Sequence, residues 1–434
     1  MTSFLMTLAA SASETASTVA DKFAVSDETY HKVMQNPDKV FFPNFGGGDN
    51  VLSEGFTVNR VLFTIPGINF KVYWYGFLIA VGILLAMIYG FRKMRSVGIN
   101  PDRATDGVIA GFFGALAFAR LYYILFNSDI SLKEFFNFRE GGLAIYGGII
   151  GAVVCGGIVI KLRKIKLAAM LDVVAPCFLI GQCIGRWGNF FNQEAFGATT
   201  DLPWGMMSSK TVNYLAENCR ELSFKAPVHP CFLYESIWCL AAFIILHIYF
   251  KHRKFDGEVF LMYAGIYGLG RFFIEATRTD SLYLMNIKVS QLVAGASVIA
   301  ALVLIIIFRN MVKRNDDYKL FVDTDLSKAQ LKEYDSYEAD KKAKKELKQK
   351  IADAKAAGES TVELKKEYEE QFGKNAKKPS DDVKEDDSSS ESYKSILEDD
   401  DASEEDTGEK ADDDKEADEA DKDNDTTEEE NSNE

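Results

Sequence analysis

Two short stretches of the sequence gather the side chains that are best suited to bind a phosphate. In the first, Tyr267, Arg271 and Glu275 are spaced four residues apart, and Arg278 follows three residues later. In an α-helix this spacing places all four side chains on one stripe. An arginine that a carboxylate orients can bind phosphate through paired hydrogen bonds, so the stripe predicts an anion site. The alternative is that Arg271 and Glu275 neutralise each other as a buried pair that only holds helices together.

The second stretch reads GRWGNFFNQE from Gly185, and it contains Arg186, Asn189 and Glu194 within nine residues. An arginine at the end of a membrane helix often does no more than extend its charge to the surface. That role requires neither the asparagine, the glutamate nor the glycines beside it. We therefore expect Arg186 to belong to a polar site, in which Glu194 orients the guanidinium and Asn189 provides a neutral donor.

Further residues supply polar or small groups near the same predicted depth. Tyr75 and His229 lie at the starts of apolar segments, and GGLAIYGG ends in Tyr146, Gly147 and Gly148. Gly147 and Gly151 form a small-xxx-small pair, which packs two helices closely. The absence of a side chain would also let a lipid headgroup approach, and the sequence leaves both possibilities open.

Seven apolar segments must position these residues. A membrane-spanning helix needs roughly 20 mostly apolar residues, because the hydrocarbon is about 30 Å thick. The segments that meet this length are 72–91, 107–126, 141–160, 167–185, 231–250, 258–276 and 289–308. The sequence thus predicts an all-α polytopic membrane protein with seven transmembrane helices.

The distribution of Lys and Arg predicts the orientation of these helices. The loops after the first, third and fifth segments are the richest in Lys and Arg, and such loops face the cytoplasm. The N-terminus is then outside, the C-terminus is cytoplasmic, and most of the polar candidates lie in the outer half of the membrane. Asp172, at the inner start of the fourth segment, is the exception.

The ends of the chain differ from its apolar middle. The net charge is −15, yet residues 380–434 alone carry 27 Asp and Glu and five Lys. We expect residues 1–60 to form an exported polar arm, 61–314 the transmembrane domain, 315–379 a charged, helical cytoplasmic segment, and 380–434 a disordered acidic tail. The six cysteines show no spacing suited to zinc, so we expect no metal and no cofactor. Nucleic-acid binding is not expected either, because the one dense Lys run carries no aromatic stacking platform.

The stretch GRWGNFFNQEAFG resembles the signature of the prolipoprotein diacylglyceryl transferase family. Other family motifs occur in the same order, namely WYG at 74–76, GGLAIYGG, HPCFLYE at 229–235 and YGLGRFFIEATR at 267–278. The resemblance covers about residues 62–310. It implies an enzyme of the bacterial cytoplasmic membrane, active at the outer leaflet, that transfers the diacylglyceryl group of phosphatidylglycerol to the lipobox cysteine of exported prolipoproteins. A thioether forms and glycerol phosphate leaves.

The resemblance also implies roles for single residues. Arg271, oriented by Glu275, would face the phosphate during transfer, and Arg186, Asn189 and Glu194 would hold the headgroup. The remaining substrate-binding positions that it implies are Tyr75, Tyr267, Arg278, His229 and Gly147. Tyr146 departs from the family, because many members have there a histidine proposed as the base that activates the thiol. A phenol is a weak base at neutral pH, so we expect Tyr146 to orient lipid or peptide while the Arg cluster stabilises the thiolate.

Two other classes of protein remain open from the residues alone. A transporter or flippase for an anionic lipid or solute would use the same Arg cluster, but its polar groups should continue to the cytoplasmic side. A membrane scaffold would use the acidic tail, but it would leave the intramembrane charges without a purpose. The oligomeric state cannot be predicted from the sequence.

Overall fold

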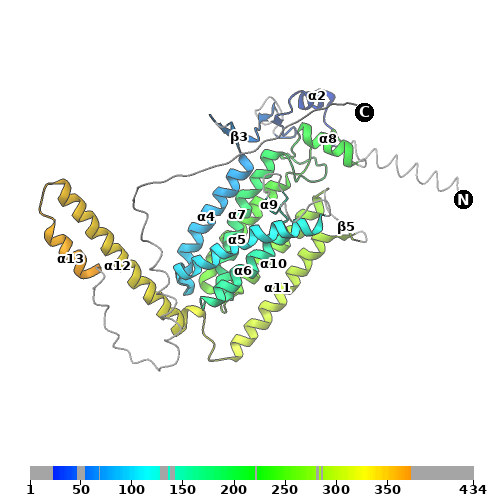
Figure 1. Cartoon of the computed structure of the whole chain (residues 1–434). Coiled ribbons are helices and arrows are strands. Elements are labelled where there is room, and N and C mark those ends of the chain that lie inside the picture. The colour runs from blue at the N-terminus through cyan, green and yellow to red at the C-terminus, as the bar shows by residue number, and fades with distance from the viewer. Residues whose placement is uncertain are drawn as a thin grey trace, which may run out of the picture. The chain divides into compact units, whose positions relative to one another are not determined.

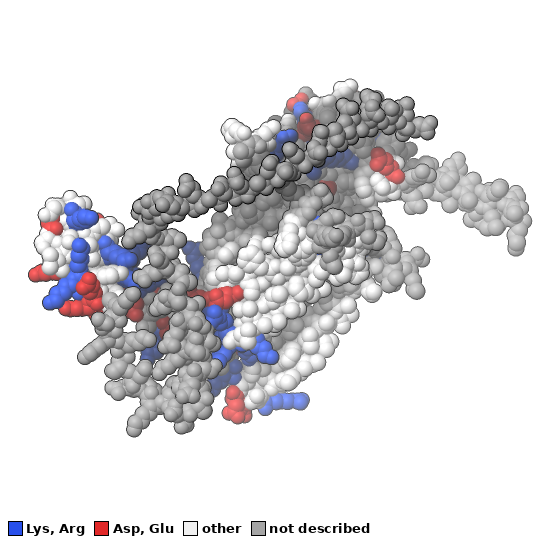
Figure 2. All heavy atoms as spheres, in the orientation of Figure 1, with Lys and Arg blue, Asp and Glu red and all other residues white. Residues whose placement is uncertain are grey.

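The computed structural model describes residues 23–45, 54–67, 69–127, 135–136, 142–219, 222–279, 283–284 and 287–372. Seven helices are long and apolar enough to cross a membrane, which confirms the predicted fold class. They are α4 (Trp74–Met94), α5 (Pro101–Phe126), α6 (Ile145–Leu162), α7 (Leu167–Asn192), α9 (Cys231–Tyr249), α10 (Glu258–Thr277) and α11 (Val289–Arg314). Figure 2 shows the side of this bundle as a broad surface free of charged residues, with Lys and Arg gathered near one end of the helices.

Helix α7 extends further than its apolar pattern predicts. The pattern ends at residue 185, whereas the helix continues to Asn192. Gln193 then adopts a left-handed conformation with φ of 55°, and its N–H donates to the carbonyls of Asn189 and Phe190, which ends the helix. Arg186 and Asn189 are therefore held on a rigid helix, three residues apart and on the same side of it.

The spanning helices associate in pairs: α5 packs on α6, α4 on α7, and α10 on α11, while α9 lies against both α7 and α10. Glycines allow α5 and α6 to approach closely, because a Cβ atom at Gly151 would lie 2.1 Å from the carbonyl oxygen of Gly114. The α5–α6 pair touches the other helices at few positions. Buried Ala104 of α5 and Ile160 of α6 nevertheless belong to the same apolar core as Val173 of α7.

A small layer of short elements that includes α2, α8 and β3 covers the end of the bundle where α7 ends and α9 begins (Figure 1). Phe41 and Met207 are fully buried in this layer and exchange two backbone hydrogen bonds of 2.8 Å. Part of the predicted polar arm is thus folded, while residues 1–22 and 46–53 lie outside the described residues. The elements are α2 (Asp27–Gln35), β1 (Lys39–Val40), β2 (Phe56–Thr57), β3 (Val61–Ile65), β4 (Phe70–Tyr73), α8 (Ser209–Asn218), β5 (Tyr283–Leu284) and β6 (Ile287–Lys288).

The strands form three antiparallel two-stranded ribbons, β1 with β2, β3 with β4, and β5 with β6. The β3–β4 ribbon leads directly into α4, and its register shifts between Val61 and Phe63. The β5–β6 ribbon leads directly into α11 and includes Lys288. These ribbons set the points at which two spanning helices begin.

The opposite end of the bundle is bound by residues 315–335, which we call the C-terminal clasp. The N–H of Phe321 donates to Asp256 Oδ2 over 2.8 Å, and Ser327 Oγ donates to the carbonyl of Gly98 over 2.7 Å. Gly98 has a φ of 81°, and a Cβ there would lie 2.1 Å from Ser327 Oγ, so only glycine allows this approach. The clasp comprises η5 (Phe321–Asp323) and the start of α12 (Asp325–Ala356).

Salt bridges extend the clasp to two helix ends. Asp335 pairs with Arg95 at 2.6 Å, and Glu333 pairs with Arg103, in the first turn of α5, at 2.7 Å. The compact unit that contains the bundle accordingly continues to Ala343, beyond the boundary expected at residue 314. A second unit begins at Lys344 and includes α13 (Val362–Phe372). In this unit the Tyr368 ring centroid lies 5.8 Å from Lys348 Nζ. The predicted acidic tail lies outside the described residues.

Candidate active site

A buried carboxylate joins the two arginines that the sequence singled out. Glu235, in the first turns of α9, forms salt bridges with Arg186 Nε of α7 and with Arg271 Nη1 of α10. Its side chain is only 3% exposed, whereas those of Arg186 and Arg271 are 25% and 20% exposed. A carboxylate that is buried between two guanidinium groups fixes the position of both. Three helices therefore meet at one charged centre.

Tyr267, Arg271 and Glu275 lie on α10 as the predicted stripe requires, but α10 ends at Thr277 and Arg278 follows it with an extended backbone, so Arg278 is not part of the stripe. Arg271 Nη2 lies 2.6 Å from Glu275 Oε2, and the Glu275 side chain is 2% exposed. The Tyr267 ring stacks on Tyr263 with centroids 5.7 Å apart, and its hydroxyl interacts with Arg186. The two arginines and two glutamates balance in formal charge. A phosphate placed here would therefore have to be bound by directed N–H groups rather than by a large excess of positive charge, which weakens the expectation that this cluster alone stabilises a thiolate.

Lys288 fixes the end of α10 that carries Glu275. Its Nζ donates to the carbonyls of Glu275, Ala276 and Arg278 over 2.8, 3.2 and 2.6 Å. A cation at a helix C-terminus satisfies carbonyls that have no partner within the helix. Lys288 thereby sets the direction in which α10 presents Arg271 and Glu275.

Asn189 and Tyr75 lie close to Arg186. The Asn189 side-chain amide makes no hydrogen bond to any residue that the structure describes. Tyr75, at the start of α4, covers Gly188, where a Cβ atom would lie 2.5 Å from the tyrosine ring. The glycine of the signature is thus needed so that the phenol can approach α7 within two residues of Arg186.

Glu194 does not orient Arg186, which corrects the sequence-based expectation. Glu194 is exposed beyond the end of α7, and its Oε1 accepts a hydrogen bond of 3.0 Å from Asn192. Asn192 Oδ1 accepts in turn from Arg60 Nε over 3.2 Å. The left-handed turn at Gln193 directs Glu194 away from the helix, so Glu235 takes the place beside Arg186.

Tyr146 and Gly147 lie at the start of α6. A Cβ atom at Gly147 would lie 2.3 Å from the carbonyl oxygen of Phe118, so Gly147 packs against α5 and offers no space to a headgroup. The Tyr146 side chain is 73% exposed, and its hydroxyl makes no hydrogen bond to a described residue. Within the described part of the chain, Tyr146 has no partner that would make it a base.

His229 and Arg278 belong to the covering layer. Trp204 Nε1 donates to the Tyr234 hydroxyl over 2.8 Å, which leaves that hydroxyl to donate to His229 Nδ1 over 3.1 Å. Burial lowers the pKa of His229, and the charge of Asp201 only partly opposes this effect, so the ring is neutral at pH 7. Arg278 directly follows the last residue of α10, and its backbone pairs with that of Gly197 in an antiparallel β-bridge.

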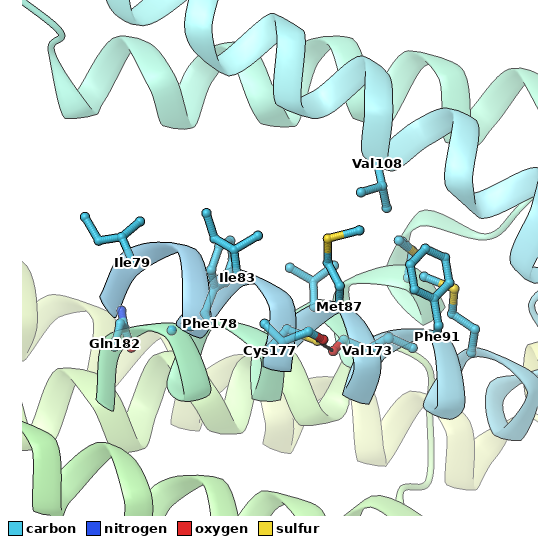
Figure 3. A pocket seen from close by; sticks show the side chains of 16 residues that line it. Ile79, Ile83, Met87, Phe91, Val108, Val173, Cys177, Phe178 and Gln182 are labelled. Atoms are coloured by element: carbon cyan, nitrogen blue, oxygen red, sulfur yellow. Dashed lines mark hydrogen bonds between the residues drawn. The ribbon is translucent and has the colours of Figure 1, made fainter. Parts of the chain in front are cut away.

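An apolar groove runs along α4 and α7 toward the charged centre. It has a volume of about 440 Å³ and is lined by Ile79, Ile83, Met87, Phe91, Val173, Cys177 and Phe178, with Val108 of α5 opposite (Figure 3). Gln182, at one end, is the polar member of the lining and donates to the Tyr263 hydroxyl over 3.2 Å. Gln182 lies one helical turn before Arg186 on α7, although none of the three residues of the charged centre lines the groove itself.

The charges at the Lys-rich and Arg-rich end of the bundle serve the fold. Asp172 accepts the N–H groups of Gly257 and Phe260 over 2.8 and 3.0 Å and thereby caps α10. Glu258 is fully buried and pairs with Arg309 of α11 at 2.6 Å. Both carboxylates have structural partners, and neither continues the polar site across the membrane.

A family model described as prolipoprotein diacylglyceryl transferase matches residues 60–307. The chain belongs to this family. All three helices that carry the Arg186–Glu235–Arg271 centre lie within the match, whereas α2, β1, β2 and the C-terminal clasp lie outside it.

Curated members of the prolipoprotein diacylglyceryl transferase family resemble the chain over nearly their whole length. The phosphatidylglycerol–prolipoprotein diacylglyceryl transferase of Clostridioides difficile is 39% identical over 249 residues, which cover 57% of this chain and 94% of the relative. The phosphatidylglycerol–prolipoprotein diacylglyceryl transferase 1 of Clostridium perfringens is 43% identical to this chain. The match covers 58% of this chain and 94% of the relative. The Thermotoga maritima enzyme is 38% identical over 60% and 88%. These matches identify the chain as a membrane transferase and do not support the transporter alternative.

Two residues of this cluster could not be paired with their partners from the sequence. Glu235 is the last residue of the motif HPCFLYE, and its place in this motif was the signal that marked it as a candidate partner for an arginine. Lys288 had no such signal, because its role depends on the β5–β6 ribbon that turns it toward α10.

Proposed function

We propose that this chain transfers the diacylglyceryl group of phosphatidylglycerol to the lipobox cysteine of exported prolipoproteins, at the outer leaflet of a bacterial cell membrane. The observation that carries the proposal is the shared carboxylate of Glu235, which holds Arg186 and Arg271 side by side, with the apolar groove of α4 and α7 reaching Gln182 one helical turn before Arg186. Such a centre can bind a phosphate while the groove receives an acyl chain of the same lipid.

The reaction forms one bond and breaks one. The sulfur of the cysteine thiolate bonds to the glyceryl carbon that carries the phosphate, the carbon–oxygen bond breaks, and the electron pair leaves with glycerol phosphate. Arg271 would stabilise the charge that develops on the leaving phosphate. Arg186 and Asn189 would hold the headgroup, with Tyr75 and Tyr267 beside it. Glu235 and Glu275 are positioning residues, because they act through the arginines.

A direct assay tests this function. The purified protein is incubated in detergent micelles with phosphatidylglycerol and a lipobox peptide, and the peptide mass is measured. We expect an adduct of one thioether-linked diacylglyceryl group, absent when the cysteine is replaced by serine or when phosphatidylcholine is the only lipid. No adduct from a protein that remains folded and monodisperse would refute the proposal.

Replacing Tyr146 with phenylalanine should reduce the transfer rate by less than about threefold. The hydroxyl is exposed and makes no hydrogen bond to a described residue, so its loss removes no arranged proton acceptor. The rate of both proteins should rise with pH toward about 8.5, the ordinary pKa of the peptide thiol. The measurement is the initial transfer rate between pH 6 and 9. A Tyr146→Phe enzyme that is a hundredfold slower would instead make the phenol a catalytic group.

A further inference from the structure

A second groove lies on the other side of the α4–α7 pair. It has a volume of about 530 Å³ and is formed by α4, α7 and α9. Its apolar part is lined by Leu85, Ile88, Leu179, Ile180, Ile184, Leu240 and Phe243. Alternate faces of α4 line the two grooves, so the second groove is separate from the one that leads to Gln182.

One end of this groove is cationic. Arg92, Lys93, Tyr89 and His247 line it there, and the lining contains no Asp or Glu. Arg92 has no carboxylate within ion-pair distance among the residues that the structure describes. The Tyr89 hydroxyl and His247 Nδ1 share a hydrogen bond of 3.1 Å, and Lys93 Nζ lies 4.2 Å from the Phe250 ring centroid.

Further positive charge surrounds this end of the groove. Lys251 and Arg253 lie close enough to Lys93 to repel its charge. Within the described part of the chain, one carboxylate forms an ion pair with these four basic residues. It is Asp172, whose Oδ2 lies 3.9 Å from Arg253 Nε and which already caps α10. The lining of this groove end is therefore positively charged, although Arg92 also lines a neighbouring hollow together with Asp102.

The cationic end lies at the membrane face opposite the active site. Arg92 is 17 residues along α4 from Tyr75, a rise of about 26 Å, and Tyr75 packs against Gly188 beside Arg186. This rise is close to the thickness of the hydrocarbon, about 30 Å. A phospholipid whose phosphate reached Arg92 would belong to the other leaflet and could not be the lipid bound at Arg186.

We propose that an anionic phospholipid of the leaflet opposite the active site binds in this groove. Its phosphate contacts Arg92 and Lys93, Tyr89 or His247 donates a hydrogen bond, and one acyl chain lies along Leu240 and Phe243. Basic pockets between spanning helices bind anionic headgroups in this way. Helices α7 and α9 line this groove and carry Arg186 and Glu235 nearer their other ends. The bound lipid therefore contacts both helices on the side of the membrane opposite these two residues.

Native mass spectrometry of the detergent-purified protein tests the proposal. Phosphatidic acid and phosphatidylcholine with identical acyl chains are added in turn, and the fraction of protein that retains lipid is measured. We expect phosphatidic acid to be retained at least about fivefold more, and the double variant R92Q/K93Q to lose most of this preference. K161Q/K313Q, which removes two lysines from the same end of the bundle, should behave as the unmodified protein.

Two further variants distinguish binding in this groove from binding elsewhere on the protein. The variant L240W fills the apolar part and should also lower retention without changing any charge. The variant R271Q, altered in the active site, should keep the preference. Equal retention of both lipids, an unchanged R92Q/K93Q protein, or displacement of the lipid by millimolar inorganic phosphate would overturn the proposal.

Discussion

Replacing Arg271 with glutamine should lower the rate of diacylglyceryl transfer by about a thousandfold, which corresponds to roughly 4 kcal/mol of activation free energy. Arg271 contacts both Glu235 and Glu275, so the substitution leaves two buried carboxylates with one partner fewer. In the proposed reaction it also removes the donor that stabilises the leaving phosphate. Its effect should appear mainly in kcat, since the interaction strengthens as charge develops on the phosphate.

The measurement is the initial rate of adduct formation at saturating phosphatidylglycerol. Arg314→Gln is the matched control, because Arg314 is exposed at the far end of α11, and it should retain at least half of the rate. Arg271→Lys keeps the charge but loses the two-pronged geometry and should recover only part of the activity. A loss of less than tenfold in a folded Arg271→Gln protein would show that Arg271 does not act on the leaving group.

Replacing Glu235 with glutamine should lower kcat/KM by about a hundredfold, although Glu235 need not touch the lipid. The side chain keeps its shape but loses the negative charge that holds the guanidinium groups of Arg186 and Arg271 side by side. Removing one member of a buried charged group is costly, about 3 to 5 kcal/mol, so the temperature of thermal inactivation should fall as well. We expect KM for phosphatidylglycerol to rise, because Arg186 is no longer directed at the headgroup.

A double-substitution cycle distinguishes positioning from a direct role. If Glu235 acts through Arg186, the losses caused by Glu235→Gln and Arg186→Gln should not add, and the double variant should be little worse than the poorer single one. Glu217→Gln, on the exposed side of α8, is the matched control and should be unchanged. Fully additive losses would mean that Glu235 contributes to transfer independently of Arg186.

The sequence predicted the parts of this site that depend on one helix. The stripe of Tyr267, Arg271 and Glu275 follows from helical periodicity alone, and the seven spans follow from the length of apolar sequence that a bilayer requires. Both are local properties of the chain. The structure confirms the seven spans and the contact between Arg271 and Glu275.

The partner of Arg186 could not be predicted in this way. Proximity in sequence favoured Glu194, but the left-handed residue Gln193 ends α7 and turns Glu194 outward. Glu235 reaches Arg186 only because α9 packs against α7, and this packing is a tertiary contact that local sequence does not encode. The C-terminal clasp was missed for the same reason, since its contacts join short polar segments that carry no periodic pattern. Gly147 was ambiguous because close packing and headgroup approach both demand the absence of a side chain.

The C-terminal clasp has a consequence for how the protein is made. A ribosome releases the chain in order, so residues 315–335 emerge after every spanning helix has been synthesised. Their contacts with Gly98, Arg95, Arg103 and Asp256 can therefore form only at the end of membrane insertion. Until then these contacts are absent, and a nascent chain that ended before residue 315 would already contain Arg186, Glu235 and Arg271 without the contacts that hold the loops at the opposite end of the bundle.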